Sequence, residues 1–317
     1  MIATVRNWVQ IGSFFILMYG GKLGINFGNM PCFACPFLPT CGGYCFLLTL
    51  QRIGIFGLAL GAEFFTKDAL LYTIKTTLIV VVYILLFSKM WCGWLCPFGT
   101  LQDWLSKLRK KLGISELVIS WKTRERIKII KYVFLGLILV VPFLVAYASL
   151  HHDLYLLFCK ICPARVILSL FAGYDRFLGI NTNNIITIIL STIAIGFAVI
   201  TVVGSFFKER FFCMVCPMLP IIQVFKKYSL VKFEKDGSIC SGCGNCERNC
   251  PVDIRKVHLA TKEKNVMEED CILCFTCLES CPENEVLKIK IWKYTVFSSS
   301  KAYALKKFLK EKINGNI

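Results

Sequence analysis

The chain has 317 residues, of which 56% are hydrophobic and only 18% charged, and its formal net charge is +17. This composition excludes an ordinary soluble protein. The basic residues stand mainly between apolar runs, which is typical of a membrane protein and not of a nucleic-acid binder. The 18 cysteines fall mostly in tight CxxC-type spacings, which indicate metal binding and not a disulfide framework.

Four apolar segments are long enough to cross a hydrocarbon core of about 30 Å as helices. The first is the weakest, because Lys22 interrupts it, and a cleaved signal peptide is the alternative interpretation of this N-terminus. Another apolar stretch, residues 46–65, contains Arg52 and Glu63, and we interpret it as an interfacial or re-entrant helix. The four predicted spans are Trp8–Phe27, Leu70–Ser88, Tyr132–Leu150 and Ile185–Phe207.

Basic loops indicate how these spans are oriented. The loop between the second and third spans and the segment after the fourth are rich in Lys and Arg, whereas residues 29–67 and 151–184 carry few positive charges. The positive-inside rule therefore places both termini in the cytoplasm. We expect a multi-pass protein of the cytoplasmic membrane.

The membrane part has the pattern of an internal duplication. In each half a span leads to a cysteine pair, then to an apolar stretch, then to a second span that ends at another cysteine pair. Lys89 and Arg210 each lie three residues before the first inner cysteine, and Gln102 and Gln223 each lie ten residues after it. Internal repeats in membrane proteins commonly carry a functional site at their interface. The repeats cover about residues 8–105 and 130–226.

Eight paired cysteines in the membrane part form two sets of four. Each set has the number of ligands that one tetrahedral metal or one [4Fe–4S] cluster requires, and two such centres would carry electrons across the membrane. Buried thiols without a ligand role are the alternative. Cys41 and Cys45 have three open interpretations: a further ligand pair, an alternative ligand set, or two thiols on one helix face. The set expected near the outer face is Cys32, Cys35, Cys159 and Cys162, and the set near the inner face is Cys92, Cys96, Cys213 and Cys216.

The strongest motif lies in residues 230–290, where two runs of four cysteines follow the pattern C-x2-C-x2-C-x3-C-P. Three closely spaced cysteines surround one cubane, and the cysteine before proline ligates the other cluster. A zinc site does not explain two matching runs. The segment is similar to bacterial two-cluster ferredoxins and is expected to have a βαββαβ-like fold. Cluster I is assigned to Cys240, Cys243, Cys246 and Cys281, and cluster II to Cys271, Cys274, Cys277 and Cys250.

Other signals are weaker. Residues 291–317 are a basic tail, expected to form a helix at the membrane surface or a partner contact. Three histidines are too few for a diheme site, and no nucleotide-binding motif is present. No residue points to acid–base or nucleophilic catalysis, so no catalytic residue is assigned, and any enzyme activity would belong to a partner of this electron-transfer subunit.

The motif Cys92-x3-Cys96-Pro97, the four-helix membrane part and the two-cluster tail resemble the NapH/MauN/NosR group of membrane polyferredoxins over roughly residues 70–290. The resemblance implies electron transfer between the quinol pool and redox partner proteins. The chain departs from the group in the two-residue spacing of Cys213 and Cys216, and in its additional outer cysteines.

Together these features predict a membrane all-α domain over residues 1–229, with four transmembrane helices and re-entrant cysteine loops, joined to an α+β ferredoxin domain. The expected function is a relay of single electrons between a membrane, quinone or extracytoplasmic partner and a cytoplasmic partner. A copper-binding and copper-reducing accessory protein is the alternative, because soft thiolates suit Cu(I). A redox-driven ion pump has less support, since Lys22 and Glu63 are the only charged intramembrane residues noted.

Overall fold

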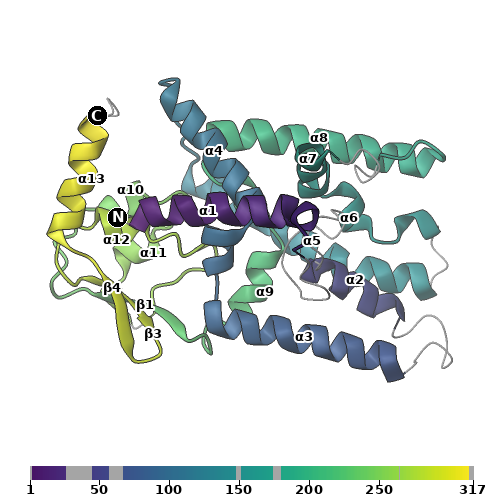
Figure 1. Ribbon diagram of the computed structural model, residues 1–317, viewed down its shortest axis with the longest axis horizontal. Coiled ribbons are helices and arrows are strands. Elements are labelled where there is room, and N and C mark those ends of the chain that lie inside the picture. The colour runs from purple at the N-terminus through teal and green to yellow at the C-terminus, as the bar shows by residue number, and fades with distance from the viewer. Residues whose placement is uncertain are drawn as a thin grey trace.

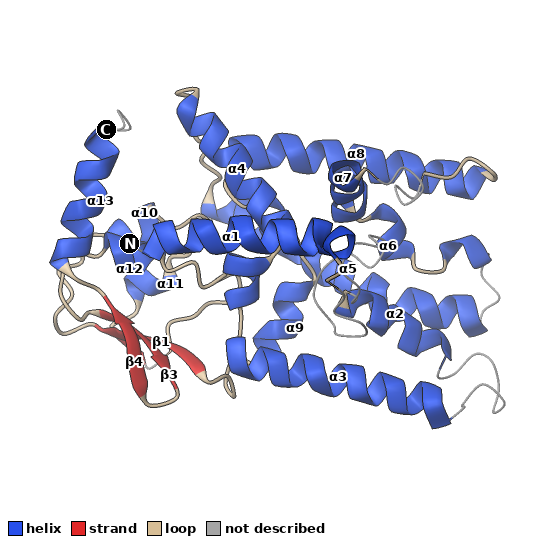
Figure 2. Ribbon diagram, in the orientation of Figure 1, coloured by secondary structure: helices blue, strands red, loops and turns tan. Residues whose placement is uncertain are grey.

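The computed structural model describes residues 2–25, 45–56, 67–147, 151–173, 180–263 and 265–313. Long helices lie side by side in one part of the molecule, and a small sheet with short helices forms the other end (Figure 1). Figure 2 shows that the strands gather at that end, next to the start of α1. The two parts meet where α1 (Ile2–Tyr19) contacts α12 (Thr276–Ser280) and where α3 (Lys67–Phe87) contacts β1 (Val231–Asp236).

The helical part has the same sequence of elements in its two halves, long helix, short helix, long helix and short helix. The first half contains α1 (Ile2–Tyr19), η1 (Gly20–Leu23), α2 (Phe46–Phe56), α3 (Lys67–Phe87), the π-helical turn η2 (Trp91–Leu95) and α4 (Pro97–Lys111). The second contains α5 (Trp121–Tyr147), η3 (His152–Leu154), α6 (Leu157–Ile161), α7 (Pro163–Ala172), α8 (Ile185–Phe207), η5 (Phe211–Met214) and α9 (Met218–Val224).

Helix α8 shows how the sequence sets one of these elements. Asn184 closes its first turn in a capping box with Thr187, which satisfies backbone N–H groups that have no partner within the helix. Ala194 and Ala198 are buried against neighbouring helices, whereas Ile189 and Val199 are more than half exposed. A helix with small residues inward and branched apolar residues outward is suited to an apolar solvent.

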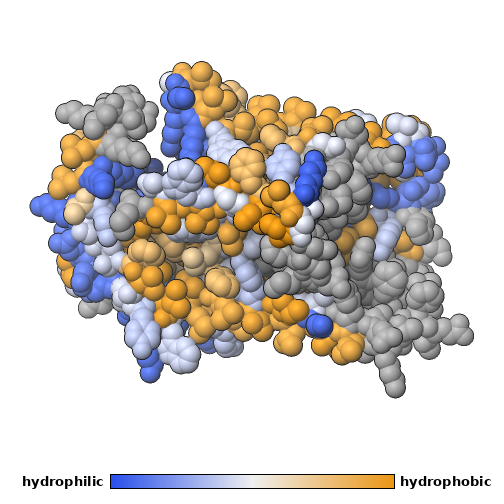
Figure 3. All heavy atoms as spheres, in the orientation of Figure 1, coloured by the Kyte–Doolittle hydropathy of each residue, from blue (hydrophilic) through white to orange (hydrophobic). Residues whose placement is uncertain are grey.

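Among the described residues, two helices are long and apolar enough to cross a membrane, Trp121–Val145 and Ile185–Phe207, and Ile74–Phe87 is a shorter apolar helix. Helix α8 has the bounds that the sequence predicted. Helix α1 instead begins and ends earlier than the predicted span at 8–27, because Gly20 and Gly21 tighten the chain into a 3-10 turn. On the face seen in Figure 3, apolar atoms cover much of the helical part, and polar atoms gather at the sheet end.

The sheet end contains four antiparallel strands in the order β2-β1-β3-β4. Phe233 of β1 lies opposite Ile289 of β3, and both side chains are buried in a core that includes the ferredoxin cysteines. The elements are β1 (Val231–Asp236), α10 (Asn245–Arg248), α11 (Lys256–Leu259), β2 (Lys262–Glu263), α12 (Thr276–Ser280), β3 (Leu287–Ile291), β4 (Tyr294–Ser298) and α13 (Lys301–Ile313).

Strand β4 differs from the prediction, which assigned residues 291–317 to a tail. The chain turns at Trp292, where φ is +57°, and returns as a strand paired with β3. Aromatic and β-branched residues such as Tyr294 and Val296 favour this pairing. Helix α13 follows, so the helical part of the predicted tail starts only at Lys301. The element order β1-α10-α11-β2-α12-β3-β4 also differs from the βαββαβ-like order expected.

Candidate functional site

The cysteines of the first predicted ferredoxin set lie around one small cavity of about 20 Å³. Lys235 and His258 line the same cavity. Gly242 and Gly244 have φ values of +70° and +72°, a conformation that costs glycine little and lets the backbone turn close to the sulfurs. The four cysteines are Cys240, Cys243, Cys246 and Cys281.

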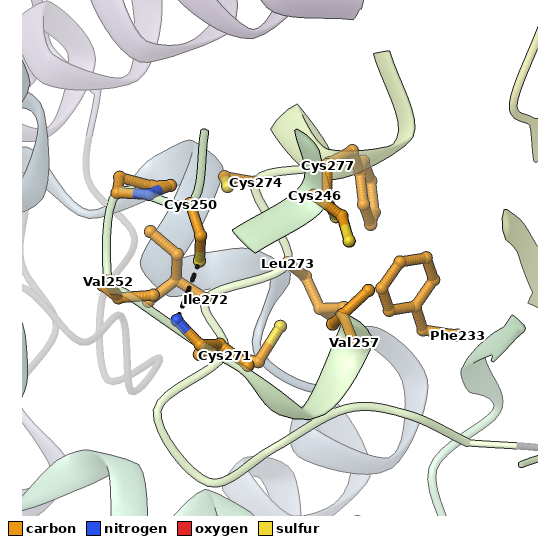
Figure 4. Close-up of a pocket in the computed structure, with 13 residues that line it drawn as sticks. Phe233, Cys246, Cys250, Val252, Val257, Cys271, Ile272, Leu273, Cys274 and Cys277 are labelled. Atoms are coloured by element: carbon orange, nitrogen blue, oxygen red, sulfur yellow. Dashed lines mark hydrogen bonds between the residues drawn. The ribbon is translucent and has the colours of Figure 1, made fainter. Parts of the chain in front are cut away.

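The second ferredoxin set lines a neighbouring cavity of about 20 Å³, shown in Figure 4. Leu273 and Phe275 have positive φ values of +50° and +60°, which are uncommon for residues other than glycine and often mark functional loops. The backbone N–H of Ile254 donates a hydrogen bond to the Cys250 sulfur at 3.3 Å. The cysteines of this set are Cys250, Cys271, Cys274 and Cys277, and Cys246 reaches the same cavity.

The donor set of both cavities fits [4Fe–4S] clusters. Burial raises the pKa of Cys271 and of Cys246 to about 11, so the thiolate form that ligates metal requires a cation beside it. Across the part of the chain that the structure describes, no three His, Cys, Asp or Glu side chains converge closely enough to hold a single ion. Soft thiolates spaced around a cavity suit a polynuclear iron centre better than one zinc ion.

The inner membrane cysteines lie between the ferredoxin part and a third cavity. Cys92, Cys96 and Cys216 line this cavity, which measures about 130 Å³. Cys213 does not line this cavity. It packs, like Cys92, against the hydrophobic core of the ferredoxin part. Cys96 is extended because Pro97 follows it, and its sulfur accepts a hydrogen bond from the backbone N–H of Gly99 at 3.4 Å.

A buried ion pair between Asp103 and Arg210 lies beside the inner cysteines. The Arg210 guanidinium donates two hydrogen bonds of 2.6 Å to Asp103, and a third of 2.8 Å to the Cys92 carbonyl oxygen. Burial opposes ionisation of Asp103, but Arg210 and Arg6 outweigh it and hold the pKa of this carboxyl below its ordinary value. A Cβ on Gly99 would lie 2.0 Å from the Arg210 guanidinium, so a larger residue there would displace this guanidinium.

The predicted outer cysteines are only partly within the described residues. Cys32, Cys35 and Cys41 lie outside them. Cys159 and Cys162 line the same cavity as Cys92 and Cys96, together with Cys45, although the sequence led us to expect them near the opposite face. The difference arises because α6 and α7 pack against α8, which brings these two cysteines to the cavity.

The ferredoxin part contacts the inner cysteine loop directly. A Cβ on Gly93 would lie 2.3 Å from the Ile272 carbonyl oxygen. The indole N–H of Trp94 donates a hydrogen bond to the Leu273 carbonyl oxygen at 2.9 Å. Ile272 and Leu273 stand between Cys271 and Cys274, which the sequence assigned to cluster II. The loop between Cys92 and Cys96 therefore touches the predicted cluster II loop.

Lys89 joins the helical part and the ferredoxin part through hydrogen bonds on one side of this contact. It is fully buried, and its ammonium donates to the side-chain oxygen of Gln223 at 2.7 Å, to the carbonyl oxygen of Glu268 at 2.8 Å and to that of Glu269. Burial lowers its pKa to about 8, so the side chain is mainly protonated at neutral pH. A positive charge therefore lies near both Cys92 and Cys271.

Asp270, the residue before Cys271, is a buried acidic residue that the sequence did not lead us to expect in the site. It is 1% exposed and forms ion pairs with Lys131 at 2.6 Å, and with Arg124 and Lys128 at 3.3 Å. These basic residues were interpreted only as marking a cytoplasmic loop. Their spacing along α5 places them on one helix face, which was the available signal of a shared acidic partner.

Comparison with known proteins agrees with this arrangement. A family model described as a 4Fe-4S binding domain matches residues 72–115 and 190–233, and one described as a 4Fe-4S dicluster domain matches residues 232–282. The uncharacterised protein MJ0749 of Methanocaldococcus jannaschii is 30% identical over 220 residues, which cover 69% of this chain and 72% of that protein. The chain belongs to the NapH/NosR-type family of 4Fe–4S ferredoxin-like proteins.

The names of two further relatives indicate the function of this family. The electron transport protein YccM of Escherichia coli is 27% identical over 72% of this chain and 58% of its own length. The ferredoxin-type protein NapH of Haemophilus influenzae is 24% identical over 70% of this chain and 67% of its own length. No solved structure matches the chain. Like its NapH/NosR-type relatives, the protein binds [4Fe–4S] clusters and functions in iron–sulfur electron transfer.

Proposed function

We propose that this NapH/NosR-type protein relays single electrons between a membrane quinone or extracytoplasmic partner and a cytoplasmic redox protein. The observation that carries the proposal is the contact of Gly93 with Ile272, which joins the membrane cysteine loop to the cluster II loop. A bound [4Fe–4S] cluster supplies one reversible electron without making or breaking a covalent bond. The protein's own contribution is to hold the cysteine sets close together and to keep water away from them.

Within this proposal, three four-cysteine centres have assigned ligands. The two ferredoxin sets are placed around two neighbouring cavities, and Cys246 lines both of them. The third centre uses one cysteine pair from each half of the membrane part, and the hydrogen bond from Lys89 to Gln223 also joins the two halves. The proposed ligands of this centre are Cys92, Cys96, Cys213 and Cys216.

Several observations support a multi-pass membrane protein with two repeats. The same family model matches a segment in each half. Leu78 of α3, Ile129 of α5 and Ile189 of α8 are each more than half exposed, which would be costly in water and is expected against lipid. With four spans, the ferredoxin part and both chain ends would lie on the cytoplasmic side, where the basic residues of α4 and α5 are found.

Metal analysis tests the third centre. We expect the anaerobically purified chain to lose about four irons when Cys92→Ser and Cys213→Ser are combined, and to retain the EPR signals of two reduced ferredoxin clusters. An equal iron content in the wild type and the double variant would contradict the assignment.

A second candidate, copper binding and reduction, is favoured by one observation. The thioether of Met218 lines the same cavity as Cys92 and Cys216, and thiolate and thioether ligands together select Cu(I). Copper measured in the same samples separates the candidates. Stoichiometric copper that disappears in the Cys92→Ser and Cys213→Ser variant would favour copper handling over an iron relay.

A further inference from the structure

The cavity in the helical part is lined by more cysteines than one four-cysteine centre needs. Its volume is about 130 Å³, compared with about 20 Å³ for each ferredoxin cavity. Three of its thiols belong to the centre proposed above, which leaves three without a role. The lining cysteines are Cys45, Cys92, Cys96, Cys159, Cys162 and Cys216.

Two of the three remaining cysteines hold related positions in the two halves. Cys45 directly precedes α2, and Cys162 directly precedes α7. Each of these short helices follows the first long helix of its half. Leu47 of α2 and Leu168 of α7 both line the cavity that the cysteines share. The sequence pattern paired Cys159 and Cys162 with Cys32 and Cys35, which lie outside the described residues. Among the described residues, Cys45 holds the position before α2 that Cys162 holds before α7.

The backbone of Cys162 has the geometry of a cysteine–proline ligand. Its φ and ψ are −68° and 121°, compared with −76° and 119° at Cys281 and −62° and 115° at Cys96. All three precede proline, which disfavours the helical conformation. Cys162 thus presents its sulfur from the same local structure as a ferredoxin ligand.

A buried amide points to the Cys159 sulfur. Gln51 of α2 is 1% exposed, and its side-chain N–H group donates to the Cys159 sulfur at 3.1 Å and to the Leu47 carbonyl oxygen. Burying an amide among apolar side chains is costly unless its donors are satisfied. Hydrogen bonds to sulfur are one of the means by which proteins set the potential of iron–sulfur clusters.

We propose that Cys45, Cys159 and Cys162 ligate a second iron–sulfur centre of the membrane part, in the same cavity as the Cys92–Cys216 centre and next to it. The three thiolates supply three of the four ligands that a cubane requires. Arg165 also lines the cavity, and its positive charge offsets part of the negative charge of the thiolates. Gln51 acts as a positioning residue through its hydrogen bond to Cys159.

This inference deepens the proposed function and rests on it. Two centres in one cavity would be neighbours in a chain of carriers, in contrast to the centres at opposite faces that the sequence suggested. One electron would enter from a reduced partner, such as a quinol, and one would leave to an oxidised partner, with no net change in the chain.

Iron content and EPR of the full-length chain test the inference. The samples are the wild type, Cys159→Ser with Cys162→Ser, Cys92→Ser with Cys213→Ser, and a control, Ser169→Ala, which alters a buried residue of α7. We expect about 16 irons in the wild type and the control, and about 12 in each double variant. A Cys159→Ser and Cys162→Ser protein with the iron content and spectrum of the wild type would overturn the inference. Failure of the proposed function would differ, because the Cys92→Ser and Cys213→Ser variant would then lose no iron.

A further variant tests the inference even if the cysteine variants misfold. Gln51→Leu removes the hydrogen bond to Cys159 but no ligand, so we expect the wild-type iron content with a lower reduction potential for one EPR signal. The potential falls because the N–H group stabilises the more negative, reduced form. A Gln51→Leu protein in which every signal keeps its wild-type potential would count against a metal on Cys159.

Discussion

Gly93 lies against the carbonyl oxygen of Ile272 so closely that a Cβ on Gly93 would stand 2.3 Å from it. The residue with the smallest side chain therefore allows the loop between two membrane cysteines to touch the loop between two cluster II cysteines. Because electron transfer slows steeply with distance, a short contact of this kind is what the proposed relay requires.

The first prediction concerns this contact. Gly93→Ala should push the two loops apart, since a backbone carbonyl cannot move aside cheaply. We expect unchanged iron content but slower reduction of the ferredoxin clusters by a quinol, measured by rapid mixing. The control is Gly136→Ala in α5, where an added Cβ would meet no atom within 4 Å. Equal rates in the two variants would show that the contact is not part of the electron path.

The second prediction concerns the buried pair of Asp103 and Arg210. Asp103→Asn leaves the fully buried Arg210 guanidinium without its carboxylate, which typically costs about 3–5 kcal/mol. We expect a corresponding loss of unfolding free energy in detergent. Glu125→Gln is the control, because Glu125 is exposed and Lys128 keeps its ion pairs with Glu268 and Asp270. Ion pairs of exposed residues typically contribute less than about 1 kcal/mol. Similar losses in both variants would contradict the importance of the buried pair.

The third prediction concerns Lys89, whose positive charge lies near both Cys92 and Cys271. Lys89→Met should lower the reduction potential of cluster II, because a positive charge stabilises the reduced, more negative form. The expected shift is tens of millivolts, about 1 kcal/mol of charge interaction, measured by EPR during redox titration. Lys110→Met, which removes a half-exposed charge of α4, should leave the potential unchanged. An equal shift in the two variants would mean that only net charge matters.

The fourth prediction concerns pH. Lys208 forms ion pairs with Glu116 at 2.8 Å and Asp253 at 2.7 Å. Burial opposes both charges, but the hydrogen bond with Lys208 outweighs it at Glu116 and lowers the pKa of this carboxyl. At Lys208 the hydrogen bonds with Asp253 and Glu116 outweigh burial and raise the pKa. An acid whose pKa is lowered by folding stabilises the fold above its unfolded pKa, which is about 4.3 for Glu. A base whose pKa is raised by folding does so below its unfolded pKa, which is about 10.4 for Lys.

Stability from this pair should therefore be constant between about pH 5 and 10. It should fall on the acid side as Glu116 is protonated, and on the alkaline side as Lys208 loses its proton. Denaturant titrations of the wild type and Glu116→Gln check this, because the variant should lack the Glu116 part of the acid limb. Parallel curves for the two proteins down to low pH would rule out this role for Glu116.

The sequence grouped the ferredoxin cysteines into two sets, because a motif of fixed spacing leaves few alternatives, and the structure places each set around a small cavity. Their role as cluster ligands stays a prediction. The sequence predicted α8 with its bounds, since an uninterrupted run of branched apolar residues has clear ends at Asn184 and Phe207. It could not predict that α6 and α7 fold back to bring Cys159 to the cavity beside Cys92. Such contacts between distant segments depend on packing, and apolar periodicity does not encode them. Asp270 was missed for the same reason, because its partners lie more than a hundred residues earlier.

Quinol-driven reduction of the protein in lipid vesicles tests the central claim most directly. The absorbance of the ferredoxin clusters is followed after a quinol is added anaerobically to the wild type and to the Cys92→Ser and Cys213→Ser variant. We predict that the wild type is reduced within the mixing experiment, whereas the variant, which retains both ferredoxin clusters, is reduced much more slowly. Equal rates of reduction in the two proteins would contradict a relay through the membrane cysteines.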